Sequence, residues 1–261
     1  MNILVCLKMV SRATYTDMLC ADDASDDRLS GGAIEINPAD AYALETALKL
    51  KDRYGAYVTV LSMSPMLAEP MLRSALAMGA DEAVLVCDRI FAGSDTIATA
   101  KTLSAALKAL PRQDMIFCGS KAIDSETGHI GAQLAALNEL RYMGDVLAVN
   151  ELRDGRLCVK HAGKHGAEEY SLVLPAVFSI INGTGMIRSP TIFGLRSSAK
   201  REIRIMTGDT LHLTAEQAGK NASGTETVRI DRLSFAHRHG AYTDDVHDGA
   251  AGLAEMLECA K

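Results

Sequence analysis

Apolar runs and helical stretches alternate four times within the first 140 residues of this 261-residue chain. A strand followed by a helix, repeated in order, is typical of a mainly parallel sheet, because parallel neighbours need long crossovers and helices fill those crossovers on both faces. We therefore predict an α/β fold with a Rossmann-like open sheet. The expected strands are residues 3–9, 57–61, 82–87 and 114–118, and the expected helices are residues 38–54, 65–78, 94–110 and 128–140.

The first of these helices has the clearest boundaries. Asn37 is a good N-cap residue, Pro38 suits the first helical position, and Asp40 lies near the positive end of the helix dipole. Gly55 is a typical stop at the other end. The segment before this helix, residues 11–35, is polar and carries no such signals.

The pattern changes after Gly144. Strand-like runs then follow one another with turns such as Asp154-Gly155 between them, which is typical of antiparallel strands that extend one edge of a sheet. We expect residues 1–190 to form a single α/β domain. The runs are residues 146–150, 157–161, 170–174 and 176–181.

Residues 191–261 have little core of their own. Periodicity is poor from residue 182 onward, and a basic stretch begins at Arg188. A last helix is expected over residues 248–260. Because a segment with few apolar positions cannot bury enough surface by itself, we expect residues 191–261 to contain a recognition loop and an arm that pack on a partner subunit.

Charge and cysteine usage exclude several classes of protein. The formal net charge of −6 and the pI of about 5.7 argue against a nucleic-acid-binding protein, whose surface is basic. No apolar run reaches the ~18 residues that cross a bilayer, and no export signal is evident, so we expect a cytoplasmic protein without membrane insertion. The six cysteines form no C-x-x-C pair and the histidines lack zinc spacing, so neither a disulfide framework nor a metal site is predicted.

Residues 119–131, which follow the fourth expected strand, are the best candidate for binding chemistry. In an open parallel sheet, ligands bind beyond the carboxyl ends of the strands. Gly119 allows close approach to the backbone, and residues 125–128 lead into a helix N-terminus whose free N–H groups suit a phosphate. Lys121 and Thr127 add a cation and a hydroxyl. We predict a nucleotide site, although the spacing matches neither common phosphate-loop motif and an ordinary capped helix is the alternative.

Two other helix starts lie where they can reach the same ligand. Asn37 and Asp40 begin the first helix, and Asp95, Thr96 and Thr99 begin the third, with hydroxyls three positions apart on nearly one face. Simple helix capping explains each segment equally well. No Ser–His–Asp order, carboxylate pair or metal constellation forms a catalytic set, which favours a carrier over a hydrolase.

Several motifs occur in order along the chain. They are Met1-Asn2-Ile3-Leu4-Val5-Cys6-Leu7-Lys8, then Asn37-Pro38 with Ala43-Leu44-Glu45, then Ala75-Leu76-Ala77-Met78-Gly79-Ala80-Asp81, and Ala122-Ile123-Asp124. Together they resemble the beta subunit of electron transfer flavoproteins, from residue 1 to about residue 205. The resemblance implies a heterodimer with a larger alpha subunit, an adenine nucleotide bound by this chain, and electron transfer between flavoprotein dehydrogenases and an acceptor.

One further stretch narrows the resemblance. Residues 88–99, Asp-Arg-Ile-Phe-Ala-Gly-Ser-Asp-Thr-Ile-Ala-Thr, are similar to the electron-bifurcating members, which hold FAD in the beta subunit where ordinary members hold AMP. This implies FAD as the cofactor, with Asp95, Thr96 and Thr99 as contacts to the longer molecule. The residues implied around the adenosine and phosphate are Cys6, Asn37, Asp40, Met63, Gly119, Lys121, Ala122, Asp124, Thr127, Gly128, His129 and Ile130.

The implied function is that of an electron-carrier subunit rather than a stand-alone enzyme. With FAD, electrons from NADH would be split between a low-potential acceptor (ferredoxin or flavodoxin) and the alpha-subunit flavin, which works with an acyl-CoA dehydrogenase. A non-bifurcating beta subunit with structural AMP is the alternative, because residues 125–130 depart from the family's usual Gly-Asp-Thr-Ala-Gln-Val. An ATP-dependent adenylating enzyme is a remote alternative, since residues 8–12 do not form the pyrophosphate loop such enzymes need.

The resemblance also places a partner-recognition loop at residues 188–200. It implies Arg188 as a partner-binding residue, and Ile192 or Leu195 as an apolar plug. An apolar anchor surrounded by polar contacts is the usual arrangement of an interface hot spot. An ordinary arginine-rich surface turn is the alternative.

Overall fold

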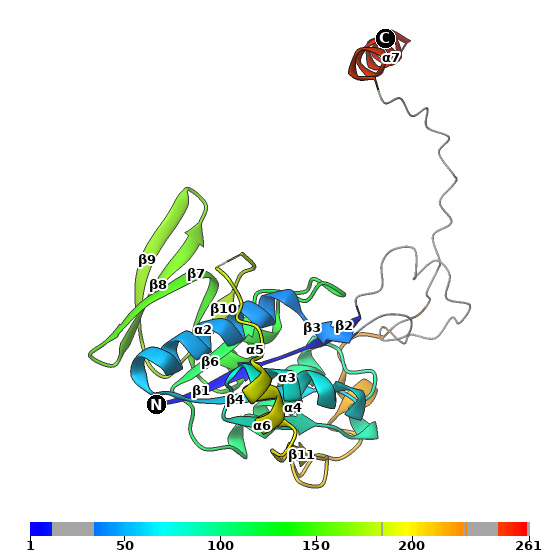
Figure 1. Cartoon of the computed structure of the whole chain (residues 1–261). Helices are drawn as coiled ribbons and strands as arrows, with labels where there is room; N and C mark the ends of the chain where they lie inside the picture. Colours follow the sequence, from blue (N-terminus) through cyan, green and yellow to red (C-terminus); the bar gives the residue numbers. More distant parts are fainter. Residues whose placement is uncertain (12–33, 184, 227, 229–244, 260–261) are drawn as a thin grey trace. The chain divides into compact units, whose positions relative to one another are not determined.

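The computed structural model describes residues 1–11, 34–183, 185–226, 228 and 245–259 (Figure 1). The chain divides into two compact units, Met1–Glu226 and Thr227–Lys261. The first unit holds the sheets and all the helices described here except one. The expected polar segment, residues 11–35, lies almost entirely outside the described residues, and the expected division at residue 190 stays a prediction.

A nine-stranded sheet in the first unit has the strand order β11-β5-β4-β1-β6-β10-β7-β8-β9. Neighbours from β11 to β7 are parallel, whereas β7–β8 and β8–β9 are antiparallel. This confirms the mainly parallel sheet with an antiparallel edge, and Figure 1 shows β7, β8 and β9 as a long ribbon at that edge. The strands are β1 (Asn2–Cys6), β4 (Tyr57–Met63), β5 (Glu82–Val86), β6 (Met115–Gly119), β7 (Arg141–Arg153), β8 (Arg156–Gly163), β9 (Gly166–Val173), β10 (Ala176–Ile180) and β11 (Arg204–Met206).

Helices cover both faces of the sheet, as predicted. On one face, α2 and α3 pack in a core with Ile3 and Val5 of β1, and on the other face α4 and α5 pack in a core with Leu4 of the same strand. Successive strand residues point to opposite faces, so an unbroken apolar run such as that in β1 is what a strand buried on both sides requires. The helices of the first unit are α2 (Pro38–Tyr54), α3 (Glu69–Met78), α4 (Thr96–Lys108), α5 (Ile130–Leu137) and α6 (Ile192–Ser198).

Short elements complete the first unit. A separate antiparallel pair, β2 and β3, lies between β1 and α2 in the chain, and three single turns of 3₁₀-helix flank the longer helices. These elements are β2 (Met9–Ser11), β3 (Ile34–Ile36), η1 (Met66–Ala68), η2 (Arg89–Phe91) and η3 (Gly219–Ala222).

Three expected helices begin later than predicted. The expected helix 94–110 starts at Thr96, after its cap Asp95. The first turn of the expected helix 65–78 is the 3₁₀ turn η1, and regular α-helix starts only at α3. The expected helix 128–140 starts at Ile130, because Gly128 has a φ of +65°, which no α-helical residue adopts. This late start leaves residues 120–129 as a loop over the end of β6.

The prediction for β10 was wrong in one respect. Residues 176–181 were expected at the antiparallel edge, but β10 lies inside the sheet and is parallel to both β6 and β7. All five residues of β10 are buried, whereas most of β9 is exposed. The uninterrupted apolar run is the mark of a central parallel strand, and the hairpin of β8 and β9 takes the edge position.

The helix α6 and the strand β11, both after residue 182, were not predicted. The helix α6 has only seven residues, capped by Thr191, whose hydroxyl accepts a hydrogen bond of 2.9 Å from the N–H of Gly194. The strand β11 has three residues and pairs with the edge of β5. Both are too short for their hydrophobic period to be recognised in the sequence.

The second unit contains α7 (Val246–Cys259). It corresponds to the helix expected over residues 248–260. Val246, Leu253 and Leu257 on this helix are exposed. Within the described part of the chain, no helix has the length and apolar character needed to cross a membrane.

Candidate functional site

The candidate site lies where the crossovers on either side of β1 diverge. The chain leaves β1 and returns through α2 to β4 on one side, whereas β6, on the other side of β1, is reached through α4. The helices α2 and α4 cover opposite faces of the sheet. A crevice at the carboxyl ends of such strands is the usual ligand site of an open α/β sheet.

Asp40 is the central polar group of this region. It lies in the first turn of α2 and is 6% exposed. Its Oδ2 accepts a hydrogen bond of 2.7 Å from the backbone N–H of Lys8, and its Oδ1 accepts one of 2.8 Å from that of Gly119. One buried carboxylate thus ties the ends of β1 and β6 to the start of α2.

Asn37 fixes the loop that follows β6. Its side-chain Nδ2 donates to the carbonyl of Lys121 at 3.0 Å, and its Oδ1 accepts from the N–H of Ile123 at 3.1 Å. Asn37 is the N-cap residue of α2, as predicted, but its side chain forms no capping hydrogen bond with that helix. The amide offers both a donor and an acceptor, and the loop uses both.

Two lysines extend over the same loop. Lys8 Nζ lies 2.6 Å from Asp124 Oδ1 and 3.5 Å from Ser125 Oγ, and Lys121 Nζ lies 3.0 Å from Glu126 Oε1. Both ion pairs are partly exposed. An anion bound here can therefore compete for two cations that the loop already holds nearby.

We name this arrangement, which the sequence predicts to hold a nucleotide, the nucleotide cradle: Lys8, Asn37, Asp40 and residues 119–130. The N-terminus of α5 follows directly, and its first N–H groups have no partner within the helix, which suits a phosphate. A cavity of about 510 Å³ adjoins the cradle. Its lining residues are Ser120, Lys121, Glu126, Gly128, Tyr142, Asp145, Ser179, Ile181 and Asn182.

The predicted cradle residues are distributed as follows. Asn37, Asp40, Gly119, Lys121 and Asp124 take part in the hydrogen bonds and ion pairs just described. Ala122 accepts backbone hydrogen bonds within the loop, and His129 immediately precedes α5 without capping it through its side chain. Thr127 and Gly128 lie in the loop and Ile130 opens α5.

Cys6 and Met63 lie at the ends of β1 and β4. Cys6 is buried beside Cys118 of β6, and this neighbour together with burial raises the pKa of the Cys118 thiol. Met63 is partly buried against the same core. Both therefore belong to the apolar core at the carboxyl ends of β1 and β4.

The three residues predicted as contacts to a longer cofactor form a separate cluster at the start of α4. Asp95 caps this helix through Oδ1, which accepts from the N–H of Ala98 at 2.9 Å, and its Oδ2 accepts from the N–H groups of Gly224 and Thr225. Thr96 Oγ1 accepts from Gln133 Nε2 of α5 at 3.2 Å. Thr99 belongs to the first turns of α4.

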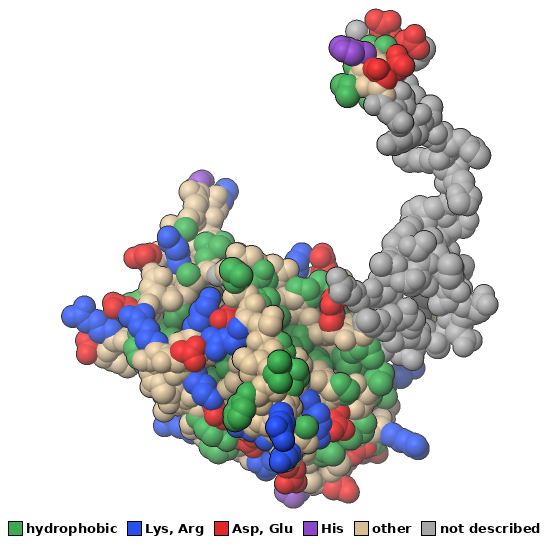
Figure 2. Space-filling view, viewed as in Figure 1, with side chains coloured by type: hydrophobic (Ala, Val, Ile, Leu, Met, Phe, Trp, Pro, Cys, Tyr) green, Lys and Arg blue, Asp and Glu red, His purple; other side chains and the backbone are tan. Residues whose placement is uncertain are grey.

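The predicted partner-binding residues lie elsewhere, on and before α6. Ile192 is 88% exposed and Leu195 51%, whereas the side chain of Arg188 is directed onto α2. Figure 2 shows hydrophobic side chains on the surface over α6, among Lys and Arg. Phe193, 83% exposed, was missed. The sequence could have indicated Phe193 through its position next to Ile192. Its exposure could be predicted only if residues 192–198 had been recognised as a helix.

Burial raises the pKa of Asp40 to about 6, although the N–H groups of Lys8 and Gly119 lower it. The folded chain therefore binds this proton more tightly than the unfolded chain, whose carboxyl has an ordinary pKa of 3.8. The resulting stabilisation is complete below pH 4 and is lost as the pH rises through 6, by about 3 kcal/mol.

We expect this dependence to vanish in Asp40→Asn. The thermal unfolding midpoints of the wild-type and variant proteins are measured between pH 4 and 7. The difference between them should change steadily, because the wild type loses stability relative to the variant as the pH rises. Other titrating groups cancel in the difference. A difference that stays constant over this range would place the folded-state pKa near its ordinary value.

Comparison with known proteins agrees with the geometry. The model of the electron transfer flavoprotein domain matches residues 30–203. The chain is 36% identical over 259 residues to the electron transfer flavoprotein subunit beta of Thermoanaerobacterium thermosaccharolyticum, covering 98% of each chain. It is 36% identical over 262 residues to the subunit of the same name from Clostridium acetobutylicum, covering 99% of this chain and 98% of the relative.

A third relative has a more specific name. The chain is 35% identical over 234 residues to the caffeyl-CoA reductase-Etf complex subunit CarD of Acetobacterium woodii, covering 88% of this chain and 87% of the relative. The family model spans about two thirds of the chain, and two beta subunits match it from end to end. The chain therefore belongs to the electron transfer flavoprotein family, and within that family to the beta subunits.

Proposed function

We propose that this chain is the beta subunit of an electron-bifurcating electron transfer flavoprotein and holds FAD in the nucleotide cradle. The observation that carries the proposal is the donor set at the end of β6: a helix N-terminus and two lysines, Lys8 and Lys121, around one loop. This set is suited to the two negative charges of a diphosphate. The name of the Acetobacterium relative, a subunit of a reductase-Etf complex, supports the same class of function.

The residues of this chain would orient the cofactor rather than react with it. Asp40 and Asn37 fix the loop from below through backbone groups, so that the lysines and the N–H groups of α5 face the ligand. The separate cluster at Asp95 and Thr96, which the bond from Gln133 to Thr96 joins to α5, would contact the longer molecule. Bound FAD would supply hydride acceptance from NADH and transfer of single electrons to a low-potential acceptor and to the alpha-subunit flavin.

Structural AMP is the second candidate, and one observation favours it. Both oxygens of Asp95 are occupied by N–H groups of Ala98, Gly224 and Thr225. A carboxylate so fully engaged has little capacity left for a ligand. A beta subunit with AMP would need the cradle alone and would not use the start of α4.

The nucleotide content of the heterodimer tests the proposal. We expect the co-expressed alpha and beta subunits, purified and denatured, to release two FAD and no AMP per heterodimer. Lys121→Gln should lower the amount of FAD retained on gel filtration, because a cation beside the phosphates is lost. The control Lys108→Gln, at the far end of α4, should retain both FAD molecules. One FAD and one AMP per heterodimer would instead support the non-bifurcating alternative.

For the partners, we propose that α6 docks on an acyl-CoA dehydrogenase-type flavoprotein and that residues 191–261 also contact the alpha subunit. Ile192, Phe193 and Leu195 give α6 an apolar surface, and the exposed leucines of α7 repeat at helical spacing, which suits burial against another chain. Free thiols are present at Cys6, Cys87, Cys118 and Cys158, which fits a reducing cytoplasm.

A further inference from the structure

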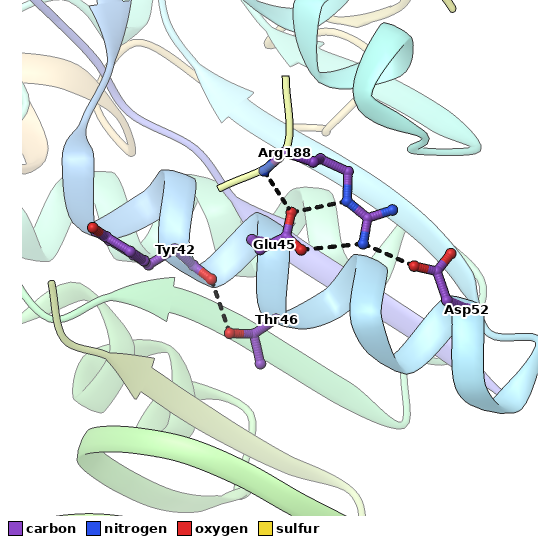
Figure 3. A network of polar contacts seen from close by, with 5 residues as sticks. All are labelled: Tyr42, Glu45, Thr46, Asp52 and Arg188. Atoms are coloured by element: carbon purple, nitrogen blue, oxygen red, sulfur yellow. Dashed lines mark hydrogen bonds and ion pairs between the residues drawn. The ribbon is translucent and has the colours of Figure 1, made fainter. Parts of the chain in front are cut away.

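The segment that leads into α6 is fastened to α2 by a single arginine. Figure 3 shows Arg188 reaching across to Glu45 and Asp52. Its backbone N–H and its Nε donate to Glu45 Oε2 at 3.1 and 2.9 Å, and its Nη2 donates to Glu45 Oε1 at 3.1 Å and to Asp52 Oδ2 at 2.8 Å. We name these contacts the Arg188 clasp.

The clasp is built around a buried charge. The Glu45 side chain is 7% exposed, whereas that of Asp52 is 61% exposed. A buried carboxylate needs a paired cation and well-directed hydrogen bonds, and the bidentate guanidinium supplies both. The two carboxylates raise the pKa of Arg188 above its usual range, so the arginine stays charged. The guanidinium is thus held against α2, and the Arg188 side chain is 30% exposed.

The other end of α6 is fastened to α3. Arg73 Nη1 donates to the carbonyls of Ser198 and Arg201, at 2.9 and 3.2 Å. Between the two ends, Gly194 lies so close to Ala77 that a Cβ at this position would collide with the Ala77 carbonyl. The helix α6 therefore packs closely against α3 at Gly194, and the Arg188 clasp fixes the chain four residues before Ile192.

We propose that Arg188 is a positioning residue, whose clasp onto Glu45 and Asp52 presents α6 in a preformed conformation to the dehydrogenase partner. The inference rests on the proposed function of α6 as the docking surface. Ile192 and Phe193 are almost fully exposed and gain nothing from the fold by themselves, so their position must be imposed by the segments on either side. A docking element ordered in advance avoids the entropic cost of being ordered on binding.

The direct alternative is that Arg188 itself contacts the partner. A double-mutant cycle separates the two roles, because residues that act through one clasp give non-additive effects. The readout is electron transfer from a short-chain acyl-CoA dehydrogenase, reduced with butyryl-CoA, to the co-expressed heterodimer. Both the KM for the dehydrogenase and kcat are measured, for Arg188→Gln, Glu45→Gln and the double variant.

We expect each single variant to raise the KM about tenfold, with kcat and nucleotide content unchanged, since only the cost of ordering α6 is added. The double variant should be no worse than either single variant. Arg188→Lys should recover part of the loss, since an ammonium pairs with Glu45 without the bidentate geometry. Arg112→Gln, at an exposed arginine in the loop before β6, is the matched control and should behave as wild type.

Asp52→Asn and hydrogen exchange keep the test informative if a Glu45 variant folds poorly. Asp52 is exposed, so its loss should be tolerated and should raise the KM about twofold, as expected of an exposed pair. In Arg188→Gln, amide exchange should increase over residues 192–198 and not over α2. Unchanged exchange in α6 would overturn the proposal.

The kinetic outcomes are also distinct. If Arg188→Gln raises the KM but Glu45→Gln does not, Arg188 contacts the partner directly and the clasp has no positioning role. If Ile192→Asp raises the KM while all clasp variants behave as wild type, the docking function stands and only this inference fails. If Ile192→Asp has no effect, the proposed docking function of α6 itself fails.

Discussion

Replacing Gly119 with alanine should cost the protein both stability and its nucleotide. A Cβ at this position would collide with Asp40 Oδ1 and would lie 2.7 Å from the Cβ of Ala39. Relief of the collision requires Asp40 to move, which breaks its hydrogen bonds to the N–H groups of Gly119 and Lys8. Overpacking and buried polar groups left without partners together cost about 3–5 kcal/mol.

The thermal unfolding midpoint and the nucleotide content of the heterodimer measure this effect. Gly252→Ala is the matched control, because nothing lies within 4 Å of a Cβ added there and alanine favours the helix. We expect Gly252→Ala to be neutral or slightly stabilising. Gly119→Ala with wild-type stability and full nucleotide content would show that the close contact between β6 and α2 does not hold the cradle.

Gly119 also shows which parts of the site the sequence reveals. The glycine at the end of a predicted strand and the helix start after it were enough to predict a ligand site, because both signals are local. Its partner Asp40 lies 79 residues away, and the loop contacts of Asn37 span 84 and 86 residues. No local pattern specifies such pairs, so Asn37 was interpreted as a helix cap, its commonest role.

The fold, like the site, has parts that local sequence patterns predict and parts that depend on distant contacts. The alternation of strands and helices predicted α2, α3 and α4 and their strands, because each element buries a periodic apolar face. The place of β10 depends on which strand the chain returns to after the β8–β9 hairpin, and that choice is made by packing against β6 and β7. The cap of α4 was expected at Ser94 or Asp95, and Asp95 forms it, but its hydrogen bonds to residues 224 and 225 are tertiary and were not foreseen.

For Arg188, the resemblance implied a partner-binding role, and an ordinary arginine-rich surface turn was the alternative. Neither interpretation predicts the surroundings of Arg188. Its carboxylate partner Glu45 lies 143 residues earlier, on a helix whose apolar stripe gives no sign of a buried charge. The exposed apolar residues of α6 therefore remain as the docking candidates, and one of them can be tested decisively.

Ile192→Asp should abolish efficient docking and leave the isolated heterodimer intact. Ile192 is 88% exposed, so the substitution removes no core packing and should change the unfolding midpoint and flavin content little. In the complex, the new carboxylate would have to be desolvated against an apolar pocket without a partner. We expect the KM for the dehydrogenase to rise about 100-fold, the range of an interface hot spot, with little change in kcat.

Three comparisons make this result specific to the exposed face of α6. Ile205→Asp, at an isoleucine of β11 that is 46% exposed, introduces the same charge elsewhere and should leave the KM unchanged. Phe193→Asp should act as strongly as Ile192→Asp, since Phe193 is 83% exposed. Leu195 is only 51% exposed, so Leu195→Asp should lower the unfolding midpoint as well as affinity. If Leu195→Asp alone impaired transfer, Leu195 would be the anchor and the assignment of Ile192 would be wrong.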